Sequence, residues 1–308
     1  MRWQLCAAWL VVLVVSARGV PAAEEESPPT LERSYLGLSS GPLRQAKLVD
    51  LPAGTLLRAG SVVVTEAQVT EQITGADEQI RKQLDKNRFF VLEQVAVQAL
   101  LLAEAQEWAR TQQISTTEET SPSLIEAHLQ SIAEKAGVSD EEIQVFFEEN
   151  KDMFGGATFE QVAPMLRPYL LGQKRDEAVA AHVNTLCKRH PVEMAAQWVK
   201  THARASLDNP VDKARRSGMP TLVDFGAQGC GPCDMMEPIL EELRLEYTGR
   251  CHILFVSVAE QQILAARYNI QSIPVQVFFD RDGKEFFRHI GFFAKEQMIA
   301  KLAEMGVK

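Results

Sequence analysis

Apolar residues recur with a helical period through the middle of the chain, from about residue 66 to 200. The clearest stripe, spaced i, i+3, i+7 and i+10 along one long predicted helix, is formed by Leu92, Val95, Ala99 and Leu102. A β-branched run at 60–65 predicts one short strand before the helices. We therefore expect an all-α helical domain over 60–202, opened by a single strand.

Capping boxes predict the starts of three further helices. In this arrangement a Ser or Thr and a Glu or Gln three residues later each cap the other's backbone N–H group. The pairs are Ser123 with Glu126, Ser139 with Glu142, and Thr158 with Gln161. Pro164 and Pro168 fall within the last helix, and proline removes a helical hydrogen bond, so we expect a kink or an interruption there.

From about residue 208 the pattern changes to short apolar strands that alternate with helices. The predicted order is β-α-β-α-β-β-α, with segments at 221–225, 235–247, 253–258, 261–268, 275–279, 285–290 and 295–305. This order implies a mixed central sheet with flanking helices. The predicted fold class is multidomain, with the all-α helical domain followed by an α/β domain at 208–308.

The first 23 residues are typical of an export signal. Arg2 gives a weak positive start, and the apolar run from Leu5 to Val15 is too short to span a bilayer as a helix. We expect a signal peptide at 1–23 that is cleaved, and a periplasmic protein; the alternative is an uncleaved N-terminal anchor. Residues 24–59, rich in Glu, Ser, Pro and Gly without a clear period, predict a linker or loosely packed arm.

Charge and cysteine content narrow the functional classes. The formal net charge is −9 at pH 7, and loss of Arg2 and Arg18 with the signal takes it to −11. Such a chain lacks the basic surface that binds phosphate backbones, so we exclude nucleic acid as a main partner. Outside the signal, Cys251 is expected to be a buried structural thiol. Cys187 is expected at a solvated helix end, where basic neighbours could lower its pKa.

Two further cysteines form the motif Cys230-Gly231-Pro232-Cys233, between a predicted strand and a predicted helix. A helix N-terminus carries unpaired N–H groups and partial positive charge, which favour a thiolate. Cys230 is then the nucleophile and Cys233 the resolving thiol of thiol–disulfide exchange. The alternatives are half of a zinc site, for which no second ligand pair is evident, and a static disulfide. We expect no metal, and no cofactor beyond the Cys230–Cys233 disulfide.

Further residues accompany the dithiol motif Cys230 to Cys233 in a fixed order: Val223-Asp224-Phe225 before it, then Pro238-Ile239-Leu240, Ile273-Pro274 and Gly291 after it. With these residues the region 208–308 resembles the thioredoxin family. The resemblance implies that Asp224 is a buried acid that relays a proton for Cys233, with a pKa raised by burial; the alternative is an Asp that caps the next loop.

The same resemblance assigns the residues around the dithiol. It implies that Ile273, Pro274 and Gly291 bind the substrate segment, with Pro274 in the cis form; an ordinary trans proline is the alternative. It also implies that Gly231 and Pro232 tune the redox potential.

This chain departs from the thioredoxin pattern beside the dithiol. Gly226 and Gly229 stand where thioredoxins usually carry tryptophan, Phe255 falls near the place of a lysine, and Asp234 follows the second cysteine. These changes alter the docking surface for substrates. The stretch 289–292 and the run after Cys233 resemble exported thioredoxin-like proteins, which implies re-reduction by a membrane thiol reductant of the DsbD/CcdA type.

Residues 60–200 resemble the N-terminal helical domain of SurA-type chaperones. The stretches that carry this resemblance are Ser139 to Ile143, Phe147 to Phe154 and Thr158 to Val162. Only Gly155-Gly156-Ala157 follows where an isomerase module often stands, so we expect no prolyl isomerase activity. The resemblance implies that the domain binds unfolded polypeptide, whereas a fully buried bundle would serve as a spacer or dimerisation arm.

These patterns together predict an exported thiol–disulfide oxidoreductase that reduces disulfides of protein substrates and holds client polypeptide on its helical domain. The alternative is a holdase chaperone whose thioredoxin domain is mainly a scaffold.

Overall fold

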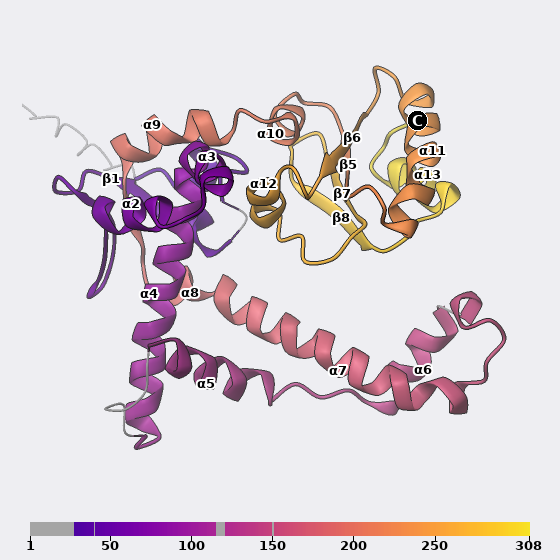
Figure 1. Cartoon of the computed structure of the whole chain (residues 1–308), viewed down its shortest axis with the longest axis horizontal. Helices are drawn as coiled ribbons and strands as arrows, with labels where there is room; N and C mark the ends of the chain where they lie inside the picture. The colour runs from indigo at the N-terminus through magenta and orange to yellow at the C-terminus, as the bar shows by residue number, and fades with distance from the viewer. Residues whose placement is uncertain (1–27, 40, 115–120, 150) are drawn as a thin grey trace, which may run out of the picture.

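The computed structural model describes residues 28–39, 41–114, 121–149 and 151–308. The expected signal peptide at 1–23 lies outside these residues. The described chain forms two units joined near residue 208, and a helical arm leaves the first of them (Figure 1).

The first unit combines helices with a small sheet. Its elements are α1 (Leu31–Ser34), η1 (Pro42–Gln45), β1 (Lys47–Val49), β2 (Thr55–Ala59), β3 (Val62–Thr65), α2 (Glu66–Thr74), α3 (Glu78–Lys86), α4 (Arg88–Thr111), α8 (Leu186–Arg189), β4 (Glu193–Ala195) and α9 (Ala196–Ser206). The region is rich in helix, as predicted, but its four strands form a sheet in the order β1-β4-β2-β3 that an all-α domain does not contain. Strand β4 comes 146 residues after β1 in the sequence and pairs with it in parallel, with Glu193 opposite Lys47.

The expected linker at 24–59 is wrong for its described part. Leu31, Leu43 and Leu57 are fully buried and belong to one core with α4. These leucines are spaced irregularly because the segment changes direction between short elements, so they show no period along the sequence. By length and composition α4 could cross a membrane, but its buried apolar side chains between Phe89 and Leu101 belong to this core.

Three helices form an arm that leaves the lower half of α4 (Figure 1). They are α5 (Ser121–Ala133), α6 (Asp140–Glu149) and α7 (Phe159–Asn184), with η2 (Lys151–Phe154) between the last two. The Ser139–Glu142 capping box is present. The Glu142 carboxylate accepts a hydrogen bond from the Ser139 backbone N–H, and the Ser139 hydroxyl accepts one from the Glu142 backbone N–H. The predicted start at Ser123 is wrong, because α5 already includes Ser121.

The arm has its own small cores. Ile143, Phe147, Val162 and Leu166 pack together where α6 meets α7. Pro164 and Pro168 lie inside α7, which continues past both as a single helix, so the predicted interruption is wrong.

The second unit has the predicted β-α-β-α-β-β-α order. Its elements are β5 (Thr221–Gly226), α11 (Gly231–Glu246), β6 (His252–Ser257), α12 (Gln262–Arg267), β7 (Val275–Phe279), β8 (Glu285–Ile290) and α13 (Lys295–Glu304). The sheet order is β6-β5-β7-β8, with β5 parallel to β6 and antiparallel to β7.

Alternation along the central strand divides this unit into two cores. Leu222 of β5 packs with α11 and α13, whereas Val223 and Phe225 pack on the other face with α12. Since successive side chains of a strand point to opposite faces, Asp224 shares the face of Leu222 and therefore looks toward α11.

A buried polar cluster joins the two units. Helix α10 (Pro210–Arg215) carries Asp212, which accepts from the Tyr268 hydroxyl at 2.6 Å and pairs with Arg267 at 3.0 Å. Arg267 also donates to the backbone carbonyls of Ser206 and Gly37, which lie in the first unit. The predicted boundary near 208 is thus a packed junction, because its charges are paired away from water.

Candidate redox site

The dithiol lies at the N-terminus of α11. Cys230 is the N-cap residue and is partly exposed, whereas Cys233, one turn further on, is buried and bonded to it as a disulfide. Gly231 and Pro232 form the exposed first turn between them, where proline costs no hydrogen bond. An incoming sulfur can therefore reach Cys230 more readily than Cys233, as the predicted roles require.

Asp224 is fully buried beneath this turn. Burial raises the pKa of its carboxyl group to about 6, and a hydrogen bond from Gln276 lowers it in part. The Gln276 amide donates to Asp224 Oδ1 at 2.7 Å, while Asp224 Oδ2 has no partner among the described residues. A buried carboxyl with one free oxygen can take up and release a proton near neutral pH.

The free oxygen lies on the side of Cys233. Asp224 Oδ2 and Cys233 Cβ are each 3.4 Å from the place that a Cβ at Gly226 would occupy. The ring of Phe255 lies 3.0 Å from the same point, so a side chain at position 226 would require this ring to shift by a few tenths of an ångström. Gly226 and Phe255, two of the four departures from the thioredoxin pattern, thus lie against one another. A hollow of about 250 Å³ beside them reaches Cys233.

The predicted substrate-binding residues lie together at one end of the sheet. The Ile273–Pro274 peptide bond is cis, as the resemblance implied, and the Gly291 backbone N–H donates to the Pro274 carbonyl at 2.8 Å. Ile290 and Phe292, on either side of Gly291, are exposed. This end of the sheet offers apolar side chains to an extended segment.

The other two described cysteines are unpaired thiols. Burial raises the pKa of Cys251 to about 12, in agreement with a structural thiol. Burial, with the nearby Glu93 carboxyl, also raises the pKa of Cys187 to about 12. The basic neighbours of Cys187 do not lower its pKa, because its side chain packs against the first core rather than into solvent.

Sequence reasoning missed Gln276. It lies opposite Asp224 in the antiparallel pair β5–β7 and is fully buried. A polar residue at the second position of the otherwise apolar run 275–279 was a usable signal, since a buried amide requires a partner. Its partner follows only once the register between the two strands is known.

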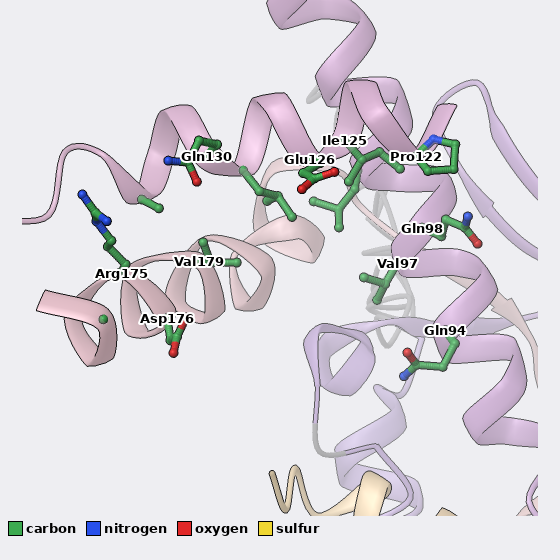
Figure 2. Close-up of a pocket in the computed structure, with 14 residues that line it drawn as sticks. Gln94, Val97, Gln98, Pro122, Ile125, Glu126, Gln130, Arg175, Asp176 and Val179 are labelled. Atoms are coloured by element: carbon green, nitrogen blue, oxygen red, sulfur yellow. The ribbon is translucent and has the colours of Figure 1, made fainter. Parts of the chain in front are cut away.

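A second hollow lies far along the sequence from the dithiol. A groove of about 700 Å³ opens between α4, α5 and α7 (Figure 2). Apolar side chains that line it are Val97, Leu101, Pro122, Ile125, Leu129, Ala133 and Val179. Polar residues that line it are Gln94, Gln98, Glu126, Gln130, Arg175 and Asp176. Arg175 Nε is buried without a hydrogen-bond partner among the described residues.

Comparisons with known proteins match the C-terminal unit. A family model described as Thioredoxin matches residues 198–304. The thioredoxin of Staphylococcus aureus (strain Mu50 / ATCC 700699) is 42% identical over 91 residues, which cover 30% of this chain and 86% of that protein. A thioredoxin crystal structure from Nicotiana alata is 27% identical, with a TM-score of 0.28, and covers 31% of this chain and 80% of its own. These matches give no support to the SurA-type resemblance of the helical region, which stays a prediction.

Proposed function

Because the chain belongs to the thioredoxin family, whose members are thiol–disulfide oxidoreductases, we propose that it is an exported reductase of protein disulfides. The observation that carries this proposal is the buried Asp224 carboxyl, whose free oxygen lies beside Cys233 under a partly exposed Cys230. A static disulfide requires no such proton acceptor.

The proposed reaction has two exchange steps. In the reduced protein the Cys230 thiolate attacks one sulfur of the substrate disulfide, and the other substrate sulfur leaves as a thiolate. Asp224 takes the proton from the Cys233 thiol, and the Cys233 thiolate then attacks the Cys230 sulfur. The second substrate sulfur leaves as a thiolate, and the protein is left with its Cys230–Cys233 disulfide. Two electrons pass to the substrate, whose thiolates take up protons.

Renewal of the dithiol requires a reductant. We propose a membrane thiol reductant of the DsbD/CcdA type, in keeping with an exported, periplasmic protein. The exposed apolar residues Ile290 and Phe292 beside Pro274 support an extended polypeptide as the substrate, because such a segment buries apolar side chains while its backbone pairs with the protein.

The helical region is proposed to hold client polypeptide in the groove between α4, α5 and α7. Its apolar residues suit the side chains of an unfolded segment, and the glutamines and Arg175 along it suit backbone carbonyls. Client binding here keeps a misfolded protein soluble while its disulfide is reduced.

Reduction of insulin disulfides by dithiothreitol tests the redox activity. Wild-type protein is expected to accelerate insulin precipitation, Cys230→Ser to abolish the acceleration, and Cys251→Ser, whose thiol is buried away from the site, to retain it. Equal rates of insulin precipitation with wild type and with Cys230→Ser would refute the proposed oxidoreductase activity. The potential of the Cys230/Cys233 pair is expected near the thioredoxin value of about −270 mV; one near the DsbA value of about −120 mV makes the protein an oxidant.

The groove also favours a second function, a holdase whose thioredoxin unit is a scaffold. The discriminating variant is the double substitution Cys230→Ser and Cys233→Ser in the full chain. If the protein is a holdase only, this double variant suppresses aggregation of a disulfide-containing client as well as wild type does, and wild type does not reduce insulin. If the protein is a reductase, wild type reduces insulin and the double variant does not.

A further inference from the structure

Three helices bring chemistry-bearing side chains together away from the dithiol. Glu104 of α4, His128 of α5 and His182 of α7 each present one ligand atom, and these atoms all lie within 4.8 Å of one another. The three come from distant parts of the sequence, which explains why no metal motif was visible there.

His128 is the unusual member of this group. Its side chain is more than nine-tenths buried, and neither ring nitrogen has a hydrogen-bond partner among the described residues. Buried polar groups without partners are rare in native proteins and point to an absent ligand. The ring stands edge-on to His182, with centroids 5.5 Å apart, and packs on Trp108. An imidazole nitrogen that carries no proton has a lone pair that can bind a ligand.

The carboxylate completes the donor set. His182 Nε2 lies 3.0 Å from Glu104 Oε2, and His190 Nε2 lies 3.2 Å from Glu104 Oε1. Imidazole nitrogens with one carboxylate oxygen are a set that zinc binds in four-coordinate sites. We propose that Glu104, His128 and His182 form a three-ligand binding site for a divalent transition metal, best suited to zinc, with a water molecule in the fourth position.

Arg189 is the competitor for this site. Its guanidinium donates to Glu104 Oε1 at 2.7 Å and lies 3.2 Å from His182 Nε2, so a cation already neutralises the carboxylate. The Arg189 side chain is more than one-third exposed, which allows it to turn into solvent when a metal takes its place. Zinc therefore binds in exchange for the Arg189 contact.

The site joins the same three helices that line the groove. Coordination by Glu104, His128 and His182 ties α5 and α7 to α4, so the metal fixes the angle at which the arm leaves the first unit.

Zinc titration of the full chain tests the proposal. The protein is stripped with a chelator and kept oxidised, so that the Cys230–Cys233 pair is not available as a ligand. One equivalent of zinc is expected to bind and to raise the melting temperature, and Co²⁺ is expected to give the visible bands of a four-coordinate site. His128→Ala is expected to weaken binding at least tenfold. His202→Ala on α9, outside the cluster, is the matched control and is expected to bind as wild type does.

Arg189→Ala keeps the test decisive if His128→Ala fails to fold. Removal of the competing cation is expected to tighten zinc binding roughly tenfold, the factor that corresponds to one charge-assisted hydrogen bond. A structural ion pair alone predicts no gain in zinc affinity. Absence of binding to oxidised wild type, unchanged affinity in a folded His128→Ala, or unchanged affinity in Arg189→Ala overturns the site.

Discussion

The Gln276 amide donates a hydrogen bond of 2.7 Å to the Asp224 carboxylate, and both side chains are fully buried. This pair replaces the lysine that thioredoxins often place near their buried acid, since Phe255 stands at that register position here. A neutral donor stabilises the carboxylate without adding a charge. Burial raises the pKa of Asp224, and this one hydrogen bond lowers it in part.

Gln276→Leu should raise the pKa of Asp224 further, because it removes the contact that opposes burial. A hydrogen bond to a charged group is worth about 1.5–3 kcal/mol, which corresponds to roughly one to two pKa units. The pH–rate profile of insulin reduction should shift upward by this amount. Gln271→Leu, an exposed glutamine near the same strand, serves as the control. A profile that does not move would show that Asp224 is not the titrating group.

Asp224→Asn should stabilise the protein at neutral pH. The folded pKa of about 6 exceeds the ordinary 3.8, so the native state binds the proton more tightly and loses stability as the pH rises between these values. Two units correspond to about 3 kcal/mol above pH 6. Urea unfolding of the oxidised proteins should therefore show a gain of up to about 3 kcal/mol at pH 7 and almost none below pH 4. Parallel pH dependences of the two proteins contradict this prediction.

Asp212→Asn should loosen the junction between the two units. The carboxylate neutralises Arg267, which is buried, and loss of one partner of a buried ion pair typically costs about 3–5 kcal/mol. We expect a lower melting temperature and faster proteolysis near residue 208. Asp208→Asn removes only the exposed pair with Lys213 and should change little. Equal proteolysis of both variants argues against a rigid junction.

Val179→Glu should weaken client binding in the groove, because it places a charge among the apolar residues on which an unfolded segment would lie. Suppression of client aggregation by the full chain measures the effect. Met165→Glu is the matched control on the same helix, since Met165 is exposed outside the groove. Insulin reduction should be unaffected in both variants. If both variants suppress aggregation equally, the groove is not the client site.

The second unit could be predicted from the sequence because its signals are local. Strand alternation, the motif at Cys230 and the proline at 274 each require only a few neighbouring residues. Lys47 pairs with Glu193 through a strand of three residues, and no periodicity within 24–59 could indicate that contact. The same holds for His128, whose neighbours come from two other helices. Gln276 is an intermediate case, because the sequence indicated that it is buried but did not indicate that Asp224 is its partner.

Under the proposed function, the junction around Arg267 restricts which clients can reach the dithiol. With the two units locked together, the separation between the α4–α5–α7 groove and Cys230 is fixed by the protein rather than by the client. An extended polypeptide spans at most about 3.5 Å per residue. Clients held in the groove can then reach the dithiol only if enough residues separate the bound segment from the disulfide. Clients would therefore be selected by the number of residues between the bound segment and the disulfide rather than by their sequence.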